Sequence, residues 1–147
     1  MHQIQRPLAA LLTLALPSLL TAQDWPTWGG DPSKNMASAV TGVDFDVDPG
    51  KRVKGSEEID LSTARGLKWA SKLGSQTYGT PTIADGRIYV GTNNASPRDE
   101  ANVGDRGNVY CFDEASGEFQ WQLIAPKLGA GKVSDWEFLG ICSSATI

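Results

Sequence analysis

Two short β-type runs meet at a turn in the stretch Thr80-Pro-Thr-Ile-Ala-Asp-Gly-Arg-Ile-Tyr-Val-Gly-Thr92. The turn is Asp85-Gly86, a strong hairpin signal because a type I′ turn needs positive φ at both central residues. A second pair of runs follows in Asn108-Val-Tyr-Cys-Phe-Asp-Glu-Ala-Ser-Gly-Glu-Phe-Gln-Trp-Gln-Leu123, with its turn at 114–117. The sequence therefore predicts four consecutive antiparallel strands at 79–84, 87–92, 108–113 and 118–123.

Parts of this unit recur elsewhere in the chain. Ser144–Ile147 matches Thr80–Ile83 at an offset of 64 residues. Trp121 matches Trp69 at an offset of 52, and Lys-Leu-Gly follows each tryptophan a few positions later. Four short antiparallel strands per repeat are typical of a β-propeller blade. We therefore expect an all-β chain, a β-propeller of four-stranded antiparallel blades, in which one blade at about 78–123 is complete.

The first residues are arranged as in a secretory signal peptide. Arg6 precedes a mostly apolar run at 8–20, and Ala22 offers a small residue for cleavage. The run has thirteen residues, too few to span a hydrocarbon core of roughly 30 Å, so no transmembrane segment is expected after its removal. We predict an exported protein, periplasmic or extracellular, with a signal peptide at 1–22, a lead-in segment at 23–66 and the start of a propeller at 67–147.

A lone blade can bury its two faces only against neighbouring blades, and a propeller typically needs four or more of them. The sequence stops at Ile147, inside a next unit that begins at about 142. We therefore expect this chain to be the N-terminal part of a longer protein.

Charge and histidine content exclude several function classes. Without the signal peptide the chain has 12 Lys and Arg (13 less Arg6) against 17 Asp and Glu, a net charge near −5. An acidic exported chain does not suggest a nucleic-acid partner or an anionic membrane. The only histidine is His2, within the signal peptide. The remaining chain therefore cannot supply a Ser/His/Asp triad, a His-ligated zinc or a histidine base.

The chain has two cysteines, Cys111 and Cys142, which are 31 residues apart. This spacing fits neither a CxxC redox pair nor a c-type haem motif. Export could oxidise the two thiols to a disulfide, and two buried apolar thiols are the alternative. The sequence leaves both states open.

The stretches 80–92 and 108–121 resemble the pyrroloquinoline-quinone (PQQ) enzyme repeat. That family's blade has a Pro-containing first strand, Asp-Gly, a Tyr-Val-Gly second strand, then Tyr-x-x-Asp-x-x-(Thr/Ser)-Gly and a Trp that ends the fourth strand. The match covers about 45 residues, with partial units on each side. The resemblance implies structural repeat roles for Trp69, Pro81, Asp85, Gly86, Tyr89, Gly91, Asp113, Gly117 and Trp121.

Four of these residues have a specific expected role. An Asp113 side chain can accept backbone N–H bonds in a tight turn, in which Gly117 takes a left-handed conformation. By resemblance, Trp121 is the docking tryptophan that packs between adjacent blades, where a large flat ring with one donor is well suited. Trp69 would play the same part for the preceding unit, as an N-terminal strand that completes the last blade and closes the ring.

One segment departs from the family pattern. Asn93 to Gly107 stand where the repeat usually has a short turn, and fifteen residues without periodicity exceed ordinary hairpin loops. Long loops on a rigid scaffold often carry binding, and a solvated decoration is the alternative. Asn94-Ala-Ser96 also fits the N-glycosylation pattern. The candidate binding residues are Asn93, Asn94, Arg98, Asp99, Glu100, Asp105 and Arg106.

The resemblance implies two function classes. The first is a non-catalytic, BamB-like scaffold for binding or assembly that meets a protein or a small-molecule ligand at the propeller face. The second is a PQQ-dependent alcohol or sugar dehydrogenase, in which the quinone carries the hydride chemistry and the protein supplies calcium, a carboxylate base and a stacking aromatic. No catalytic, cofactor or metal residue can be assigned, and Asp99, Glu100 and Asp105 would hold a cation only if they converge. We predict the scaffold. Binding of PQQ with calcium is expected only if the dehydrogenase alternative holds.

Overall fold

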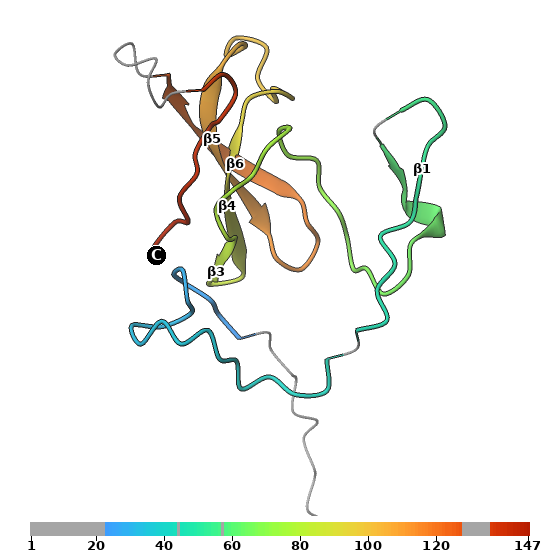
Figure 1. Ribbon diagram of the computed structural model, residues 1–147, viewed down its shortest axis with the longest axis vertical. Helices are drawn as coiled ribbons and strands as arrows, with labels where there is room; N and C mark the ends of the chain where they lie inside the picture. The colour runs from blue at the N-terminus through green and yellow to red at the C-terminus, as the bar shows by residue number, and fades with distance from the viewer. Residues whose placement is uncertain (1–22, 44, 57, 128–135) are drawn as a thin grey trace, which may run out of the picture.

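The computed structural model describes residues 23–43, 45–56, 58–127 and 136–147 (Figure 1). The predicted signal peptide at 1–22 lies outside these residues. Within them, two antiparallel sheets of two and four strands and one 3₁₀ helix make up the regular structure, so the chain is all-β as predicted. No helix in the described ranges is long and apolar enough to cross a membrane.

The main sheet is a meander in which neighbouring strands follow one another along the chain and pair antiparallel. This order agrees with the prediction, but the strand ends differ. The first strand is shorter than expected and begins just after Pro81, which has no backbone N–H to donate to a ladder. The last two strands are longer, because pairing continues to Arg106 opposite Pro126. The strands are β3 (Thr82–Ala84), β4 (Arg87–Asn93), β5 (Arg106–Asp113) and β6 (Phe119–Pro126).

Both predicted turns are confirmed. Asp85 and Gly86 have φ values of 50° and 70°, the left-handed pair that a type I′ hairpin requires. In the second turn, Gly117 has a φ of 74° and its N–H donates to the carbonyl of Asp113 at 2.8 Å. The Asp113 carboxylate accepts from both the hydroxyl and the N–H of Ser116, and these two bonds lower its pKa. Each turn therefore rests on the residue types that predicted it.

Side-chain alternation gives the main sheet two faces. The aromatic face carries the core, Val90, Tyr110 and Phe112, with Leu73 and Phe119 packed against it. The rings of Tyr110, Phe112 and Phe119 meet edge to face, with centroids 5.8 to 6.1 Å apart. The opposite face, called here the tryptophan face, carries three residues that pair across the strands, Tyr89, Cys111 and Trp121.

The C-terminal segment 136–147 runs along the tryptophan face (Figure 1). The N–H of Ile141 donates to the carbonyl of Thr92 at 3.2 Å. A Cβ on Gly91 would lie 2.7 Å from the carbonyl oxygen of Ile141, and a Cβ on Gly107 would lie 2.8 Å from its Cδ1. The two glycines therefore open the space that Ile141 fills, and this is the role of the predicted repeat residue Gly91.

The lead-in segment begins at the edge of the main sheet and then leaves it. Trp25 forms an antiparallel bridge with Ile83 of β3 through bonds of 2.8 and 2.9 Å. Further along, the chain forms an arm at residues 50–66, drawn apart from the main sheet in Figure 1. An antiparallel bridge between Asp48 and Arg65 closes its base. The arm contains β1 (Lys51–Arg52), β2 (Ile59–Asp60) and the 3₁₀ helix η1 (Leu61–Thr63).

Candidate functional site

Trp69 docks on the second turn of the meander. Its Nε1 donates to the carbonyl of Glu114 at 2.9 Å. A Cβ on Gly117 would lie 2.4 Å from the indole ring, so only glycine leaves room for the ring there. The ring also lies against Phe112, with centroids 6.4 Å apart. A tryptophan from before the main sheet is therefore held by the turn between β5 and β6, through both packing and a hydrogen bond.

Trp121, which the sequence matches to Trp69, lies on the tryptophan face and is 42% exposed. Its ring contacts Tyr89, with centroids 5.9 Å apart. Leu123, two residues further along β6, is also exposed. β6 is the last strand in the order of the main sheet, so these side chains form an apolar border beside a strand edge that no other strand of the described residues pairs with.

At the other end of the sheet, Asn93 joins three segments of the chain. This fully buried residue accepts the N–H of Ser75 at 2.9 Å and that of Ala95 at 3.1 Å through its Oδ1. Its Nδ2 donates to the hydroxyl of Ser75 and to the carbonyl of Phe138. All the hydrogen-bonding capacity of this amide is used inside the protein. Asn93 is therefore a structural residue, and it belongs to β4 rather than to a binding loop.

Asn94 has a similar structural role inside the loop. Its Nδ2 donates to the carbonyls of Asn102 and Gly104 at 2.7 and 2.9 Å. Its Oδ1 accepts from the amide of the buried Asn108 at 2.8 Å. The side chain is nearly fully buried and its amide nitrogen is engaged, whereas glycosylation needs that nitrogen at the surface. The glycosylation pattern is therefore not an accessible acceptor in this fold.

Arg98 fastens the loop to the aromatic face. Its guanidinium carbon lies 4.7 to 5.5 Å from the ring centroids of Tyr110, Phe112 and Phe119. These distances are within the range of cation–π attraction. One Nη also donates to the carbonyl of Lys72 at 2.6 Å. The loop between β4 and β5 thus folds back over the core.

The three loop carboxylates do not converge. Asp99 accepts from the amide of Asn102 at 2.6 Å and from the N–H of Ala101 at 2.9 Å, and these bonds lower its pKa. Glu100 is exposed, and Asp105 points to a different part of the chain. Within the described residues no group of three or more Asp, Glu, Cys or His side chains could hold a metal ion. These carboxylates therefore do not fit a calcium site.

Asp105 instead ties the start of β5 to the end of β6 and to the C-terminal segment. Its carboxylate accepts from Nζ of Lys127 at 2.6 Å and from the N–H of Phe138 at 3.0 Å. The Lys127 bond, followed by the Phe138 bond, lowers the pKa of Asp105. The neighbouring Arg106 donates through Nε to the carbonyl of Val103 at 3.1 Å. A pocket of about 310 Å³ lies beside this group.

Both cysteines are free thiols in this structure. Cys111 is buried on the tryptophan face, and this burial raises the pKa of its thiol. Cys142 is exposed in the C-terminal segment. Cys111 therefore fits the alternative of a buried apolar thiol, the exposed Cys142 does not, and no disulfide joins the two.

Three residues that position the site were not among the candidates. Asn108 holds the loop through Asn94, Lys127 pairs with Asp105, and Ile141 covers the glycines of the tryptophan face. Asn108 lies in the quoted repeat stretch, where a buried amide beside alternating apolar residues was a usable signal. Lys127 and Ile141 lie outside the matched repeat, and nothing local in the sequence marks their partners.

Comparison with known proteins adds no relative. No protein-family model matches the chain, and neither a curated protein nor a solved structure matches it. The candidate site is therefore defined by its geometry alone. It consists of the ordered loop at one end of the sheet and the exposed apolar border along β6.

Proposed function

We propose that residues 67–147 begin an exported, PQQ-like repeat β-propeller that acts as a non-catalytic scaffold for binding or assembly. The observation that carries the proposal is the docking of Trp69 on the turn at Gly117 and Glu114. A tryptophan that ends one unit and packs on the turn of the next would join successive blades.

Trp121 extends the same reasoning in the other direction. It occupies the position equivalent to Trp69 and is 42% exposed beside the exposed Leu123. A following unit with its own Asp-x-x-x-Gly turn would cover this ring in the way that the turn at 113–117 covers Trp69. The apolar border along β6 therefore supports a repeat array.

The loop at 94–105 supports a scaffold rather than a reactive centre. The side chains of Asn94, Arg98 and Asp99 bond within the protein and hold the loop in one shape. Glu100 and Val103 are left exposed on this ordered loop. An ordered exposed loop on a sheet is a surface that a protein partner can recognise without large ordering cost.

The first experiment tests for quinone chemistry. The protein is incubated with PQQ and calcium, and dye reduction is measured with a panel of alcohols and sugars, with a known quinoprotein dehydrogenase as the positive control. We expect no substrate-dependent reduction. Turnover that saturates with PQQ would overturn the scaffold proposal in favour of the dehydrogenase.

The second experiment tests for binding at the loop. A photo-crosslinking amino acid replaces Glu100 or Val103 in the exporting cell, and the matched control carries it at the exposed Ala115 of the opposite turn. A scaffold should give one discrete adduct from the loop positions and none from the control. Identical adduct patterns from both ends of the sheet would speak against a specific loop partner.

A further inference from the structure

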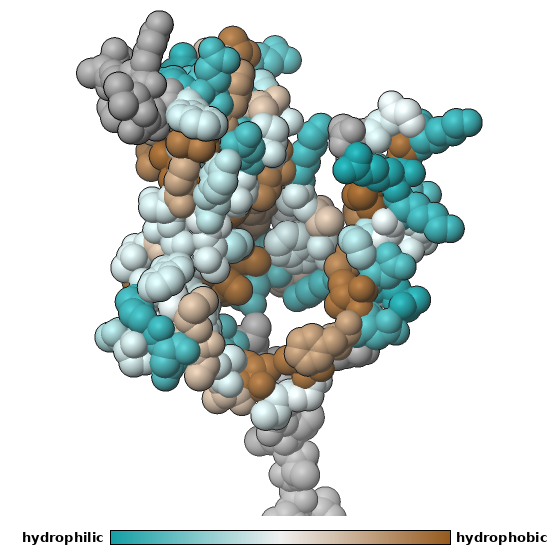
Figure 2. All heavy atoms as spheres, in the orientation of Figure 1, coloured by the Kyte–Doolittle hydropathy of each residue, from teal (hydrophilic) through white to brown (hydrophobic). Residues whose placement is uncertain are grey.

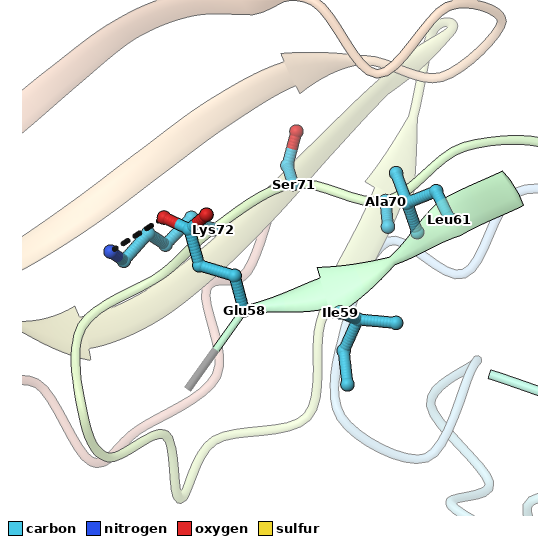
Figure 3. Close-up of a pocket in the computed structure, with 6 residues that line it drawn as sticks. All are labelled: Glu58, Ile59, Leu61, Ala70, Ser71 and Lys72. Carbon is cyan, nitrogen blue, oxygen red and sulfur yellow. Dashed lines mark ion pairs between the residues drawn. The ribbon is translucent and has the colours of Figure 1, made fainter. Parts of the chain in front are cut away.

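A groove of about 350 Å³ lies between the arm and the segment that follows it. Ile59 and Leu61 contribute to its apolar lining, and the exposed ion pair between Glu58 and Lys72 spans it at 4.0 Å (Figure 3). Figure 2 shows hydrophobic residues along the side of the arm that faces the main sheet. The backbone beside this groove is already engaged, because Arg98 donates to the carbonyl of Lys72. The groove is therefore not where an extended chain would add.

The outer edge of β6 differs from this groove because its backbone is free. β6 is the last strand of the main sheet and pairs only with β5. Among the described residues, no other backbone hydrogen bond reaches 119–126. The free N–H and C=O groups of such an edge are a template to which a further strand can add.

β6 also lacks the features that usually protect an edge strand from pairing. Its sequence, Phe-Gln-Trp-Gln-Leu-Ile-Ala-Pro, contains no charged side chain over eight positions. Pro126, which has no N–H to donate, is the last residue of the strand. The irregularity in its pairing with β5 lies opposite Cys111 and Phe112, near the start of β6. The stretch 121–125 is therefore regular, uncharged and unpaired on its outer side.

The side chains on either side of Gln122 make this edge complementary to itself. Trp121 and Leu123 lie on the tryptophan face and are 42% and 61% exposed. Residues that lie opposite each other in an antiparallel pair have their side chains on the same face. When two copies of β6 pair with their Gln122 residues opposite each other, Trp121 of each copy lies opposite Leu123 of the other. Both exposed apolar side chains then gain a cross-strand partner.

The side chain of Gln122 is a second, independent observation. Its Oε1 is buried and has no hydrogen-bond partner among the described residues. A buried amide oxygen without a partner is destabilising. When two Gln122 residues lie opposite each other, rotation of both side chains toward the edge lets the Nε2 of each donate to the Oε1 of the other. The second copy therefore supplies the partner that this amide lacks in the single chain.

We propose that β6 strands of two copies pair antiparallel about Gln122 and join the two main sheets into one sheet of eight strands. The contact is two-fold and uses the same edge on both copies, so association stops at the dimer. The eight residues of β6 extend over about 27 Å, a small contact. We therefore expect a dissociation constant on the order of 10 µM. The pairing uses the strand edge and leaves the tryptophan face uncovered, so the proposal is independent of the scaffold function.

The charge of the chain sets the sign of the salt dependence. Without the predicted signal peptide, the net charge of each copy is near −5, whereas β6 itself carries no charge. Two copies therefore repel each other without any ion pair at the contact, and salt screens this repulsion. Raising the ionic strength from ~0.02 M to ~0.3 M should lower the dissociation constant about threefold. A dimer that weakens in salt would show that a different, charged surface forms the contact.

The first test measures molar mass by light scattering on a size-exclusion column over a range of concentrations. The unmodified protein should pass from monomer to dimer. Gln122→Lys and Gln122→Glu each place like charges opposite each other and should remain monomeric. An equimolar mixture of the two variants places opposite charges at the same point and should form a heterodimer. Gln76→Lys and Gln76→Glu change an exposed glutamine outside the main sheet, and both should still dimerise.

Hydrogen exchange of the unmodified protein tests the same contact without any substitution. The amides of 121–125 should exchange more slowly well above the dissociation constant than well below it, and those of β3, at the other edge, should not change. Exchange at 121–125 that is independent of concentration would contradict the pairing. A protein that is still monomeric at ~10 times the expected dissociation constant, or charged variants that do not associate when mixed, would overturn the proposal.

Discussion

At the residue scale, asparagine and aspartate side chains of the predicted loop serve the fold. Asn93 uses its whole amide to join 75, 95 and 138, and Asn94 holds the loop carbonyls. Such buried amides are costly to leave unpaired, so each fixes its neighbours in one arrangement. The polar composition that suggested ligand binding is therefore explained by internal hydrogen bonds.

Asp105 should make the stability of the protein depend on pH. Its bonds to Lys127 and Phe138 hold its pKa below the ordinary value of 3.8. A lowered pKa in the folded state means that the stabilisation is complete above that ordinary value and is lost as the pH falls through the folded pKa. Asp105→Asn should therefore cost about 1 kcal/mol at pH 7 and progressively less below pH ~4.

Urea unfolding of both proteins between pH 7 and ~2.5 measures this difference. Other carboxylates titrate equally in the two proteins and cancel in the comparison. Glu100→Gln, which removes an exposed carboxylate from the same loop, is the matched control and should follow the unmodified protein at every pH. A stability difference for Asp105→Asn that stays constant down to the lowest pH would contradict the assignment.

At the scale of elements, the loop between β4 and β5 is a packed part of the sheet. Arg98 lies over the rings of Tyr110, Phe112 and Phe119 and donates to the carbonyl of Lys72, a residue before β3. The loop therefore connects the aromatic face with the segment that carries Trp69. Sequence periodicity cannot show this contact, because its partners are separated by 12 to 26 positions in the chain.

Replacing Arg98 should loosen this loop while the strands stay paired. Arg98→Ala removes the cation–π contacts and the bond to Lys72, at a cost of about 1 to 2 kcal/mol. Hydrogen exchange should then become faster at 95–105 and change little in β5. Glu100→Ala, an exposed neighbour, is the control with normal exchange. Unchanged protection of the loop in Arg98→Ala would show that the asparagine bonds suffice without it.

At the scale of the whole molecule, the chain is held together by contacts between distant segments. Trp25 joins the edge of β3, Ile141 covers the tryptophan face, and Trp69 packs against the aromatic face. Ile147 also donates its N–H to the carbonyl of Pro26 at 3.0 Å. The main sheet is therefore contacted on both faces by segments that precede and follow it in the chain.

Trp69 should be the most important of the tryptophans for stability. Trp69→Ala removes the ring from the turn at Gly117 and should cost about 2 to 3 kcal/mol, because the ring is only partly buried. Trp69→Phe keeps an aromatic ring but loses the hydrogen bond to the Glu114 carbonyl. We expect the loss of this bond to cost about 1 kcal/mol, apart from any effect of altered packing.

Thermal unfolding followed by circular dichroism compares these variants with Trp136→Ala. Trp136 is 74% exposed, so its replacement should change stability by less than about 0.5 kcal/mol. Equal melting temperatures for Trp69→Ala and Trp136→Ala would show that the docked tryptophan does not stabilise the main sheet.

The sequence by itself determined the meander, because its signals are local. Positive φ at Asp85 and Gly86, the Asp113 to Gly117 turn and the alternation in the strands each depend on residues a few positions apart. Only the tertiary structure decided what the polar loop does. The acceptors of the Asn93 Nδ2 lie 18 and 45 positions away, and whether a buried amide meets a ligand or its own chain depends on which segments pack beside it.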